Sequence, residues 1–330
     1  MIKCQPYWIT SLSSFTSILN NIWFARQASS VQNYCYALRK FFAFCCVFEG
    51  GVSLPVSALR AASYISFVKD NSGSRGAISV AWNALKWVHN FVPFLNRFND
   101  PLEDKIIKCV VESALRSVQA KKNVKKPLSG NFVRSVLRSV NPLSLVDLRN
   151  SSIIALAYSL LLRHDEVSHI SCLHLSKVSG GLKVFLPSSK TDVYRLGKSV
   201  FLSSGGESTP VYKLLFSYLE KANLCLGQDH FLFGPMVYAS QLASASIGNK
   251  VLSYNSYRLI LREKLILCGL NPQLYGFHSC RKGGATSLAP YVSQYELLTV
   301  GRWKDPRSLS HYVEISDQRK LGMSKDLLSR

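Results

Sequence analysis

The segment His278-Ser-Cys-Arg-Lys-Gly-Gly-Ala-Thr286 lies at the start of a predicted helix over 279–289. It places a histidine and an arginine three residues apart, and residues at that spacing lie on one face of a helix. A second segment, Val300-Gly-Arg-Trp-Lys-Asp-Pro-Arg-Ser-Leu-Ser-His-Tyr312, follows downstream. Considered alone, His278 and Arg281 would be ordinary helix-surface residues. A functional role for them depends on which residues occur elsewhere in the chain.

An arginine also follows the strongly apolar segment 145–162, which predicts a buried helix. Arg163 comes directly after this segment, and Glu166 lies three residues further on. A buried guanidinium is costly unless an anion pairs with it, so Arg163 is expected to have an anionic partner. A simple Arg163–Glu166 ion pair is the favoured interpretation of this segment taken by itself.

The apolar period changes from helical to strand-like after this helix. The runs 182–186 and 196–202 are rich in β-branched and aromatic residues and lie between glycine- and serine-rich turns. They predict a small antiparallel sheet whose connecting turn, 188–192, contains Lys190. The segment 234–253 is rich in glycine, serine and alanine and is predicted as a loop. Helical spacing marks four further segments, at 209–223, 255–268, 279–289 and 292–300.

Residues 1–118 are predicted to form a helical N-terminal domain. Four segments have helical apolar spacing, near 31–45, 55–70, 75–92 and 101–119, and a further helix is predicted around 11–25. The second domain is expected to span 128–330. It begins with a helix through about Val140 that Ser129 caps.

Positive charge dominates the chain, which has 40 lysines and arginines against 19 acids and a formal charge of +21. Nucleic acid is the commonest polyanionic partner for such an excess. No acid occurs from Ser113 to Val146. That stretch includes the predicted linker 119–127 and seven bases: Arg116, Lys121, Lys122, Lys125, Lys126, Arg134 and Arg138. We expect all of these except Arg116 to be candidates for contact with the DNA backbone. A solvated or nuclear-targeting run is the alternative interpretation.

Several function classes are disfavoured by the composition. The apolar run 153–162 is too short to cross a membrane, and the N-terminus lacks the apolar core of a secretory signal. Nine cysteines are scattered, with no Cys-x-x-Cys pair, which favours a reducing compartment over a disulfide framework. The protein is therefore expected to be intracellular and associated with DNA, in the nucleus if the host is eukaryotic.

Taken together and in order, these segments resemble the tyrosine recombinase (phage integrase) family. Its pattern is an arginine with an acid three residues later, a lysine in a β-hairpin, a His-x-x-Arg box, a histidine or tryptophan, and a nucleophilic tyrosine nine residues beyond. The matching residues are Arg163, Glu166, Lys190, His278, Arg281, Trp303 and Tyr312. The Arg-Lys-Gly-Gly-Ala-Thr sequence is similar to members from eukaryotic mobile elements. One departure is Arg302, which stands where many members have glycine.

The resemblance implies that Tyr312 attacks a phosphodiester and forms a 3′-phosphotyrosyl link, so that DNA is cleaved and rejoined without ATP. Arg163 and Arg281 would hold the non-bridging oxygens of the phosphate, with His278 and Trp303 as further donors. Glu166 would stabilise the conformation of the segment that contains Arg163. Lys190 is expected to protonate the departing 5′ oxygen. No metal and no cofactor is required by this chemistry.

The resemblance also implies a mainly α fold with a small antiparallel β-sheet, in which a helical core-binding domain and an α+β catalytic domain clamp double-stranded DNA. The expected function is site-specific recombination or integration of a mobile element. The expected active form is a homotetramer on two DNA sites. The tail 313–330, which contains Leu321, Met323, Leu327 and Leu328, is expected to lodge in a neighbouring protomer.

Four alternatives compete with this interpretation. The spacing of His164, His169, Cys172 and His174 follows no zinc pattern. Metal-dependent nucleases need converging carboxylates, and no spacing unites the acids available here. A type IB topoisomerase-like enzyme uses related tyrosine chemistry, but the His-x-x-Arg box and the short Trp303–Tyr312 spacing disfavour it. A non-catalytic DNA-binding protein derived from a recombinase is disfavoured because every position of the pattern is filled.

Overall fold

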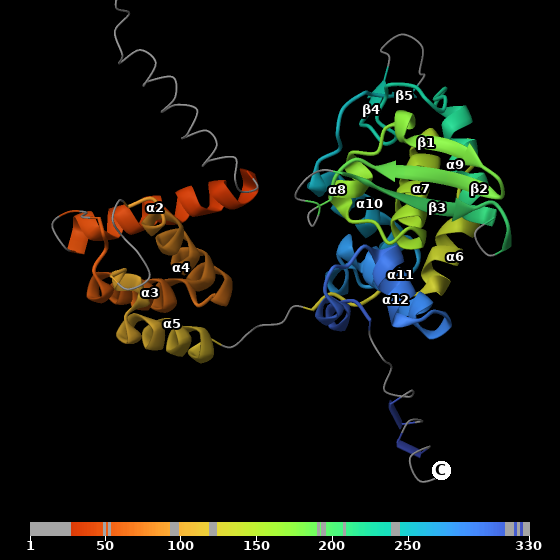
Figure 1. Ribbon diagram of the computed structural model, residues 1–330. Coiled ribbons are helices and arrows are strands. Elements are labelled where there is room, and N and C mark those ends of the chain that lie inside the picture. Colours follow the sequence, from red (N-terminus) through yellow and green to blue (C-terminus); the bar gives the residue numbers. More distant parts are fainter. Residues whose placement is uncertain are drawn as a thin grey trace, which may run out of the picture. The chain divides into compact units, whose positions relative to one another are not determined.

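The computed structural model describes residues 28–48, 51, 54–92, 99–118, 124–189, 192, 196–206, 209–238, 245–313, 320–321 and 324–325. The chain divides into two compact units, residues 1–122 and 123–330 (Figure 1). Each unit has its own hydrophobic core. The helix predicted around 11–25 lies outside the described residues, as do Lys121, Lys122 and Lys190.

The N-terminal unit is helical, and its helices lie where the apolar spacing predicts them. They are α2 (Ala28–Phe48), α3 (Ala58–Ser72), α4 (Arg75–His89) and α5 (Lys105–Ser117), with the 3-10 turn η1 (Pro101–Glu103) before α5. Ser57, Ser74 and Asp104 cap α3, α4 and α5 by accepting hydrogen bonds from backbone N–H groups of the first turn. The core includes Phe41, Tyr64, Ile78, Leu85 and Ile107.

The C-terminal unit is built around the buried helix α7 (Leu145–Ser159), whose apolar side chains point in all directions. Helices α6 (Gly130–Arg138), α9 (Thr209–Lys221), α10 (Tyr254–Leu267) and α11 (His278–Leu288) pack against it or against one another. In Figure 1 the sheet lies toward one end of this unit, and α11 and α12 (Gln294–Gly301) lie toward the other.

The main sheet has three antiparallel strands in the order β1 (Leu175–Val178), β2 (Gly181–Leu186) and β3 (Lys198–Ser203). The predicted hairpin corresponds to β2 and β3, whereas β1 was not predicted. The segment predicted as a loop at 234–253 contains a second antiparallel pair, β4 (Met236–Tyr238) and β5 (Ala245–Ile247). The mainly α architecture with small antiparallel sheets confirms the predicted fold class.

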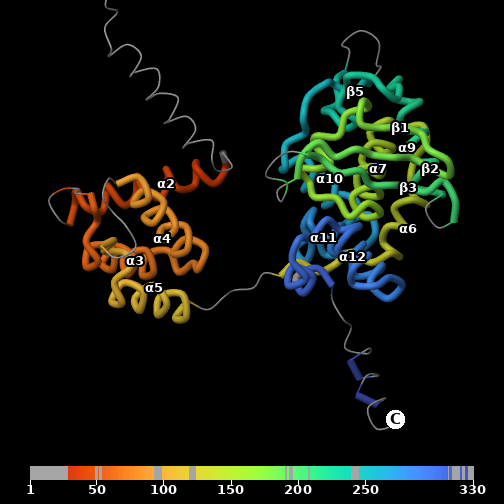
Figure 2. The backbone as a smooth tube through the Cα atoms, viewed as in Figure 1, coloured from red at the N-terminus to blue at the C-terminus, as the bar shows by residue number. Residues whose placement is uncertain are grey.

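A glycine pair allows α11 to pack closely on the unit's centre (Figure 2). A Cβ at Gly283 would lie 2.0 Å from the Leu128 carbonyl oxygen, and one at Gly284 would lie 2.3 Å from the Tyr158 carbonyl oxygen. Both distances are too short for any side chain. The Leu128 N–H donates to the Ser279 carbonyl at 3.0 Å, so the chain at the end of the predicted linker is bonded to the C-terminal unit.

None of the helices in the described ranges combines the length and the apolar character needed to cross a membrane.

Candidate active site

The first half of the site forms where the apolar helix ends. The prediction placed one helix over 145–162, but α7 ends at Ser159 and Leu161 adopts a left-handed conformation with φ of +50°. An L residue in that conformation costs roughly 1–2 kcal/mol. The turn places Arg163 at the N-terminus of the short helix α8 (His164–Ser168), rather than at the end of α7.

Glu166 forms the predicted ion pair with Arg163. Its Oε1 accepts a hydrogen bond from Arg163 Nη1 at 2.8 Å, and its Oε2 accepts one from the Arg163 backbone N–H at 2.8 Å. The side chain of Arg163 is 13% exposed, whereas that of Glu166 is almost completely buried. Arg163 is therefore anchored on one side and open to solvent on the other.

Two further arginines converge on the same carboxylate. Arg302 Nη2 donates to Glu166 Oε2 at 2.9 Å, and Arg281 Nη1 lies 3.9 Å from that oxygen. Both arginines are buried. Three guanidinium groups thus surround Glu166, and the cluster of these four side chains keeps a net positive charge of two. A surplus of positive charge held in a buried cluster favours binding of an anion.

Arg281 is held by backbone carbonyls from two distant segments. Its Nη1 donates to the Leu161 carbonyl and its Nη2 to the Gly301 carbonyl. Its guanidinium lies over the Trp303 ring, 4.5 Å from the centroid, and 5.2 Å from the Tyr312 ring centroid. Arg281 Nε is buried and has no hydrogen-bond partner among the described residues.

The aromatic side chains of the second segment gather on Arg281. The ring centroids of Trp303 and Tyr312 are 4.8 Å apart, and those of His278 and Tyr312 are 5.0 Å apart. Trp303 is buried, and within the described residues its indole Nε1 has no hydrogen-bond partner. A Cβ at Gly301 would lie 1.7 Å from the Trp303 ring, so only glycine permits this packing.

Tyr312 is positioned by contacts with its own chain. Its backbone carbonyl accepts a hydrogen bond from Thr286 Oγ1 at 3.0 Å, and its N–H donates to the Leu309 carbonyl at 2.8 Å. The ring packs against a small apolar cluster that includes Leu161, Ala285 and Trp303. Helix α11 therefore holds both the His278–Arg281 pair and the backbone of Tyr312.

The charges of the cluster shift the titration of its members. Partial desolvation, together with the positive charges of Arg281 and Arg163, lowers the pKa of His278 to about 4, although part of the residue faces solvent. Burial opposes ionisation of Glu166, but the charges of Arg302, Arg163 and Arg281 outweigh it and lower the pKa of that carboxyl. At neutral pH the site therefore holds a neutral imidazole, an ionised carboxylate and three guanidinium groups.

Comparison with known proteins finds relatives in sequence and in fold. The chain is 23% identical over 271 residues to an integrase/recombinase XerD homologue of Selenomonas ruminantium, covering 82% of this chain and 76% of that protein. No family model matches the chain. The fold is similar to that of XerH site-specific recombinase bound to a palindromic difH substrate, with a TM-score of 0.61, 13% identity, and coverage of 91% of this chain and 80% of that one.

Two other solved structures share the fold. The Tn1549 transposon integrase in complex with transposon right end DNA gives a TM-score of 0.59 at 13% identity, covering 90% of this chain and 94% of that one. A lambda integrase dimer bound to a COC′ core site gives 0.56 at 14% identity, covering 92% and 94%. In sequence and in fold, the chain is similar to proteins of the tyrosine recombinase family. The similarity to members from eukaryotic mobile elements stays a prediction.

The structure brings six of the seven predicted catalytic residues together: Arg163, Glu166, His278, Arg281, Trp303 and Tyr312. Lys190 lies outside the described residues. Arg302 is a member of this cluster that had no predicted role. Its only signal was an arginine in a place where many family members have glycine.

The candidate DNA-backbone residues are distributed differently. Arg134 and Arg138 are exposed on α6, and Lys126 is exposed just before it. Lys125 is half-buried, and its Nζ donates to the Gln273 carbonyl at 2.6 Å. Lys121 and Lys122 lie outside the described residues.

The histidines and cysteines after Arg163 do not converge. Among the described residues, no group of three histidine, cysteine, aspartate or glutamate side chains is arranged to hold a metal ion. His174 Nδ1 instead accepts a hydrogen bond from the Ser171 backbone N–H at 3.0 Å, and Cys172 lies in the core.

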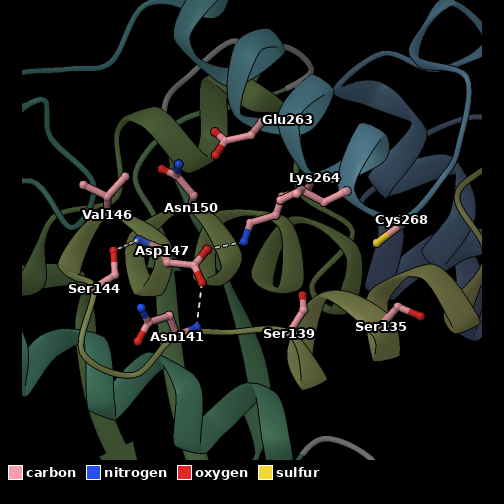
Figure 3. Close-up of a pocket in the computed structure, with 11 residues that line it drawn as sticks. Ser135, Ser139, Asn141, Ser144, Val146, Asp147, Asn150, Glu263, Lys264 and Cys268 are labelled. Carbon is pink, nitrogen blue, oxygen red and sulfur yellow. Dashed lines mark hydrogen bonds and ion pairs between the residues drawn. The ribbon is translucent and has the colours of Figure 1, made fainter.

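A pocket of about 700 Å³ lies between α6, α7 and α10, and none of the predicted catalytic residues lines it (Figure 3). Lys264 and Asp147 form an ion pair in it, and Asp147 Oδ2 also accepts from the Asn141 backbone N–H at 2.7 Å. Its lysine and its nearest carboxylate are paired with each other, so this pocket is not a second cluster of surplus positive charge.

Proposed function

We propose that this protein is a site-specific DNA recombinase or integrase in which Tyr312 cleaves and rejoins DNA strands through a 3′-phosphotyrosyl intermediate. The similarity in sequence and fold to proteins described as recombinases and integrases supports the recombinase activity. The observation that carries the assignment of the nucleophile is the packing of the Tyr312 ring against His278, Trp303 and Arg281.

The cleavage step transfers a phosphoryl group to the tyrosine. Tyr312 Oη bonds to the phosphorus, the bond from phosphorus to the 5′ oxygen breaks, and the phosphate stays on the 3′ end of the strand. The number of phosphoester bonds does not change, so the reverse step can rejoin a strand without ATP. The phenolic proton must leave as Oη attacks. Because the pKa of His278 is about 4, its imidazole is neutral near pH 7 and is available to accept this proton.

The arginines supply charge where it develops in the transition state. The non-bridging oxygens gain negative charge, and the open side of Arg163 and the unpartnered Nε of Arg281 are donors for them. The buried Trp303 Nε1, which has no hydrogen-bond partner among the described residues, is a further donor in the site. Donors held in place before the reaction contribute about 10²–10³-fold each to the rate of related acyl-transfer enzymes.

Lys190 completes the proposed site as the general acid. The 5′ oxygen would otherwise leave as an alkoxide, which is a very poor leaving group near neutral pH. An ammonium donor removes that barrier. This role rests on the position of Lys190 in the sequence, between the segments that form β2 and β3.

The DNA partner is proposed to lie along the basic residues around the linker. The charge of +21 and the exposure of Lys126, Arg134 and Arg138 support contact with phosphates. The domain assignment proposed is a DNA-binding domain at 1–118, a linker at 119–127 and a catalytic domain at 128–330. We further propose assembly as a homotetramer on two DNA sites through the tail 313–330, and action in the nucleus if the host is eukaryotic.

Trapping of the covalent adduct tests this function. A duplex is selected from a random-sequence pool by binding to the Tyr312→Phe protein, which keeps every group except the hydroxyl. The wild-type protein is expected to form an adduct with this duplex on a denaturing gel, with EDTA present, and to exchange strands between two duplexes of different length. Strict dependence on magnesium would contradict the proposal. An adduct without strand exchange would favour the topoisomerase-like alternative, and binding without an adduct would favour the non-catalytic one.

A further inference from the structure

Arg302 is an arginine in a backbone conformation that disfavours it. Its φ is +58° at the C-cap of α12, in the left-handed region where a Cβ atom is strained and glycine is not. The side chain is nevertheless buried, with 5% of the residue exposed. Residues held in strained conformations persist only when the surrounding contacts compensate, and such residues concentrate at functional sites.

Apart from one bond to the Val300 carbonyl, the side-chain hydrogen bonds of Arg302 all go to residues 160–166, the segment that contains Arg163. Its Nη2 donates to the Leu161 carbonyl at 2.8 Å and to Glu166 Oε2 at 2.9 Å. Its Nη1 donates to the Leu160 carbonyl at 3.2 Å and to the Val300 carbonyl at 2.9 Å. Arg302 therefore ties the end of α12 to the turn before Arg163.

The same two acceptors also hold the predicted phosphate-binding arginines. The Leu161 carbonyl accepts from Arg281 as well as from Arg302, and Glu166 accepts from Arg163 as well as from Arg302. A change at Arg302 is thus transmitted to both arginines through atoms that they share.

The positive charge of Arg302 also affects how Glu166 interacts with the other two arginines. If Arg302 were absent, the full negative charge of Glu166 would be shared between Arg163, at 2.8 Å, and Arg281, at 3.9 Å. Each guanidinium would be drawn toward the buried carboxylate and away from an incoming phosphate. With Arg302 present, a third guanidinium, whose two terminal nitrogens each donate to two protein acceptors, balances part of that charge.

We propose that Arg302 is a positioning residue that neutralises Glu166 and fixes the Leu161 carbonyl, so that Arg163 and Arg281 stay available to the scissile phosphate. The inference rests on the proposed function. Arg302 is not assigned a contact with DNA, because each of its two terminal nitrogens already donates to two protein acceptors, whereas each of those of Arg281 donates to one.

A charge-rescue experiment tests this role in the full-length protein. Arg302→Gly removes the side chain and relieves the backbone, and the selected duplex described above is the probe. We expect adduct formation at saturating protein to slow by about 10–100-fold, in line with the cost of small misplacements in active sites. The Kd for the duplex is expected to change by less than about threefold. Adding Glu166→Gln to Arg302→Gly should recover at least about tenfold of the lost rate, because the unbalanced charge is gone.

Controls separate positioning from folding. Asn223 also has a positive φ, +54°, and it is exposed and distant in sequence from Arg302. Asn223→Gly therefore relieves backbone strain without changing a residue of the site. Its adduct rate should equal that of the wild type. If Arg302→Gly does not fold, Arg302→Lys replaces it, since one ammonium can reach Glu166 but cannot also serve the carbonyls. The lysine variant should slow adduct formation by about 3–10-fold at unchanged Kd.

Two results would overturn the inference. One is an adduct rate for Arg302→Gly, or for Arg302→Lys if the glycine variant does not fold, equal to that of the wild type. The other is a slowed variant that Glu166→Gln does not rescue, which would leave Arg302 as a structural residue only. Absence of any adduct with the wild-type protein would instead count against the proposed function, so the two failures are distinguishable.

Discussion

The hydroxyl of Thr286 donates a hydrogen bond to the backbone carbonyl of Tyr312, with 3.0 Å between Oγ1 and the oxygen. This bond joins the His278–Arg281 helix to the segment of the proposed nucleophile, within one chain. It therefore sets the distance between the phenol and the groups that would hold the phosphate.

Thr286→Val is predicted to slow adduct formation by about 3–10-fold, which corresponds to the loss of one ordinary hydrogen bond. Valine keeps the shape of threonine and removes only the donor. Thr286→Ser is the matched control, because it retains the hydroxyl and should keep most of the rate. Equal rates for the valine and serine variants would mean that the bond does not position Tyr312.

The pKa of His278 predicts how stability depends on pH. Its pKa is lowered from the ordinary value of 6.5 to about 4, so between these values the unfolded chain binds a proton that the folded protein does not. The stability that this residue contributes is therefore present above about pH 6.5 and is lost as the pH falls toward 4.

His278→Gln should remove this part of the pH dependence. The drop in Tm between pH 7 and pH 5 is expected to be smaller in the glutamine variant than in the wild type. A drop of the same size in both proteins would contradict the lowered pKa.

Adduct formation by the Lys190→Ala variant is predicted to be severely slowed on ordinary DNA. Its rate should be largely restored on DNA with sulfur at the scissile 5′ bridging position. A thiolate leaves without protonation, so the variant no longer needs the acid. The comparison is the ratio of adduct rates on the two substrates. A defect of equal depth on both would make Lys190 a binding or positioning residue, with His278 the next candidate for the acid.

The basic span predicts a change in salt dependence. Replacing Lys121, Lys122, Lys125 and Lys126 with alanine should weaken binding to all sequences similarly and reduce the slope of log affinity against log salt by about 0.9 per lost phosphate contact. Replacement of the same residues with arginine is the control, because it keeps every charge. An alanine variant with an unchanged slope would indicate a solvated linker or a targeting signal.

Local patterns in the sequence predicted much of this molecule. Helical spacing located the four described N-terminal helices, and the Arg163–Glu166 spacing predicted their ion pair, because both depend on neighbours within a few residues. Strand β1, Leu175–Val178, escaped prediction because only Leu175 is buried, which leaves no alternation to detect. The pair β4 and β5 lies in a segment whose composition resembles a loop.

Such local patterns could not predict the long-range contacts of the site. That Arg302 would turn inward to Glu166 depends on left-handed conformations at both Leu161 and Arg302, two positions where sequence favours other residues. The bonding of Leu128 to Ser279, which joins the end of the linker to the C-terminal unit, likewise depends on residues far apart in the chain.

The central claim, that Tyr312 is the nucleophile, is tested most directly by locating the DNA on the protein. Trypsin cuts after Arg307 and Arg319, and the peptide between them contains one tyrosine, Tyr312; Tyr291 and Tyr295 fall in a different tryptic peptide, 283–302. The trapped adduct is digested with nuclease and trypsin and analysed by mass spectrometry. The account predicts a nucleotide attached through its 3′ phosphate to Tyr312 in the peptide 308–319. A nucleotide on the peptide 283–302, or a 5′ linkage, would contradict it.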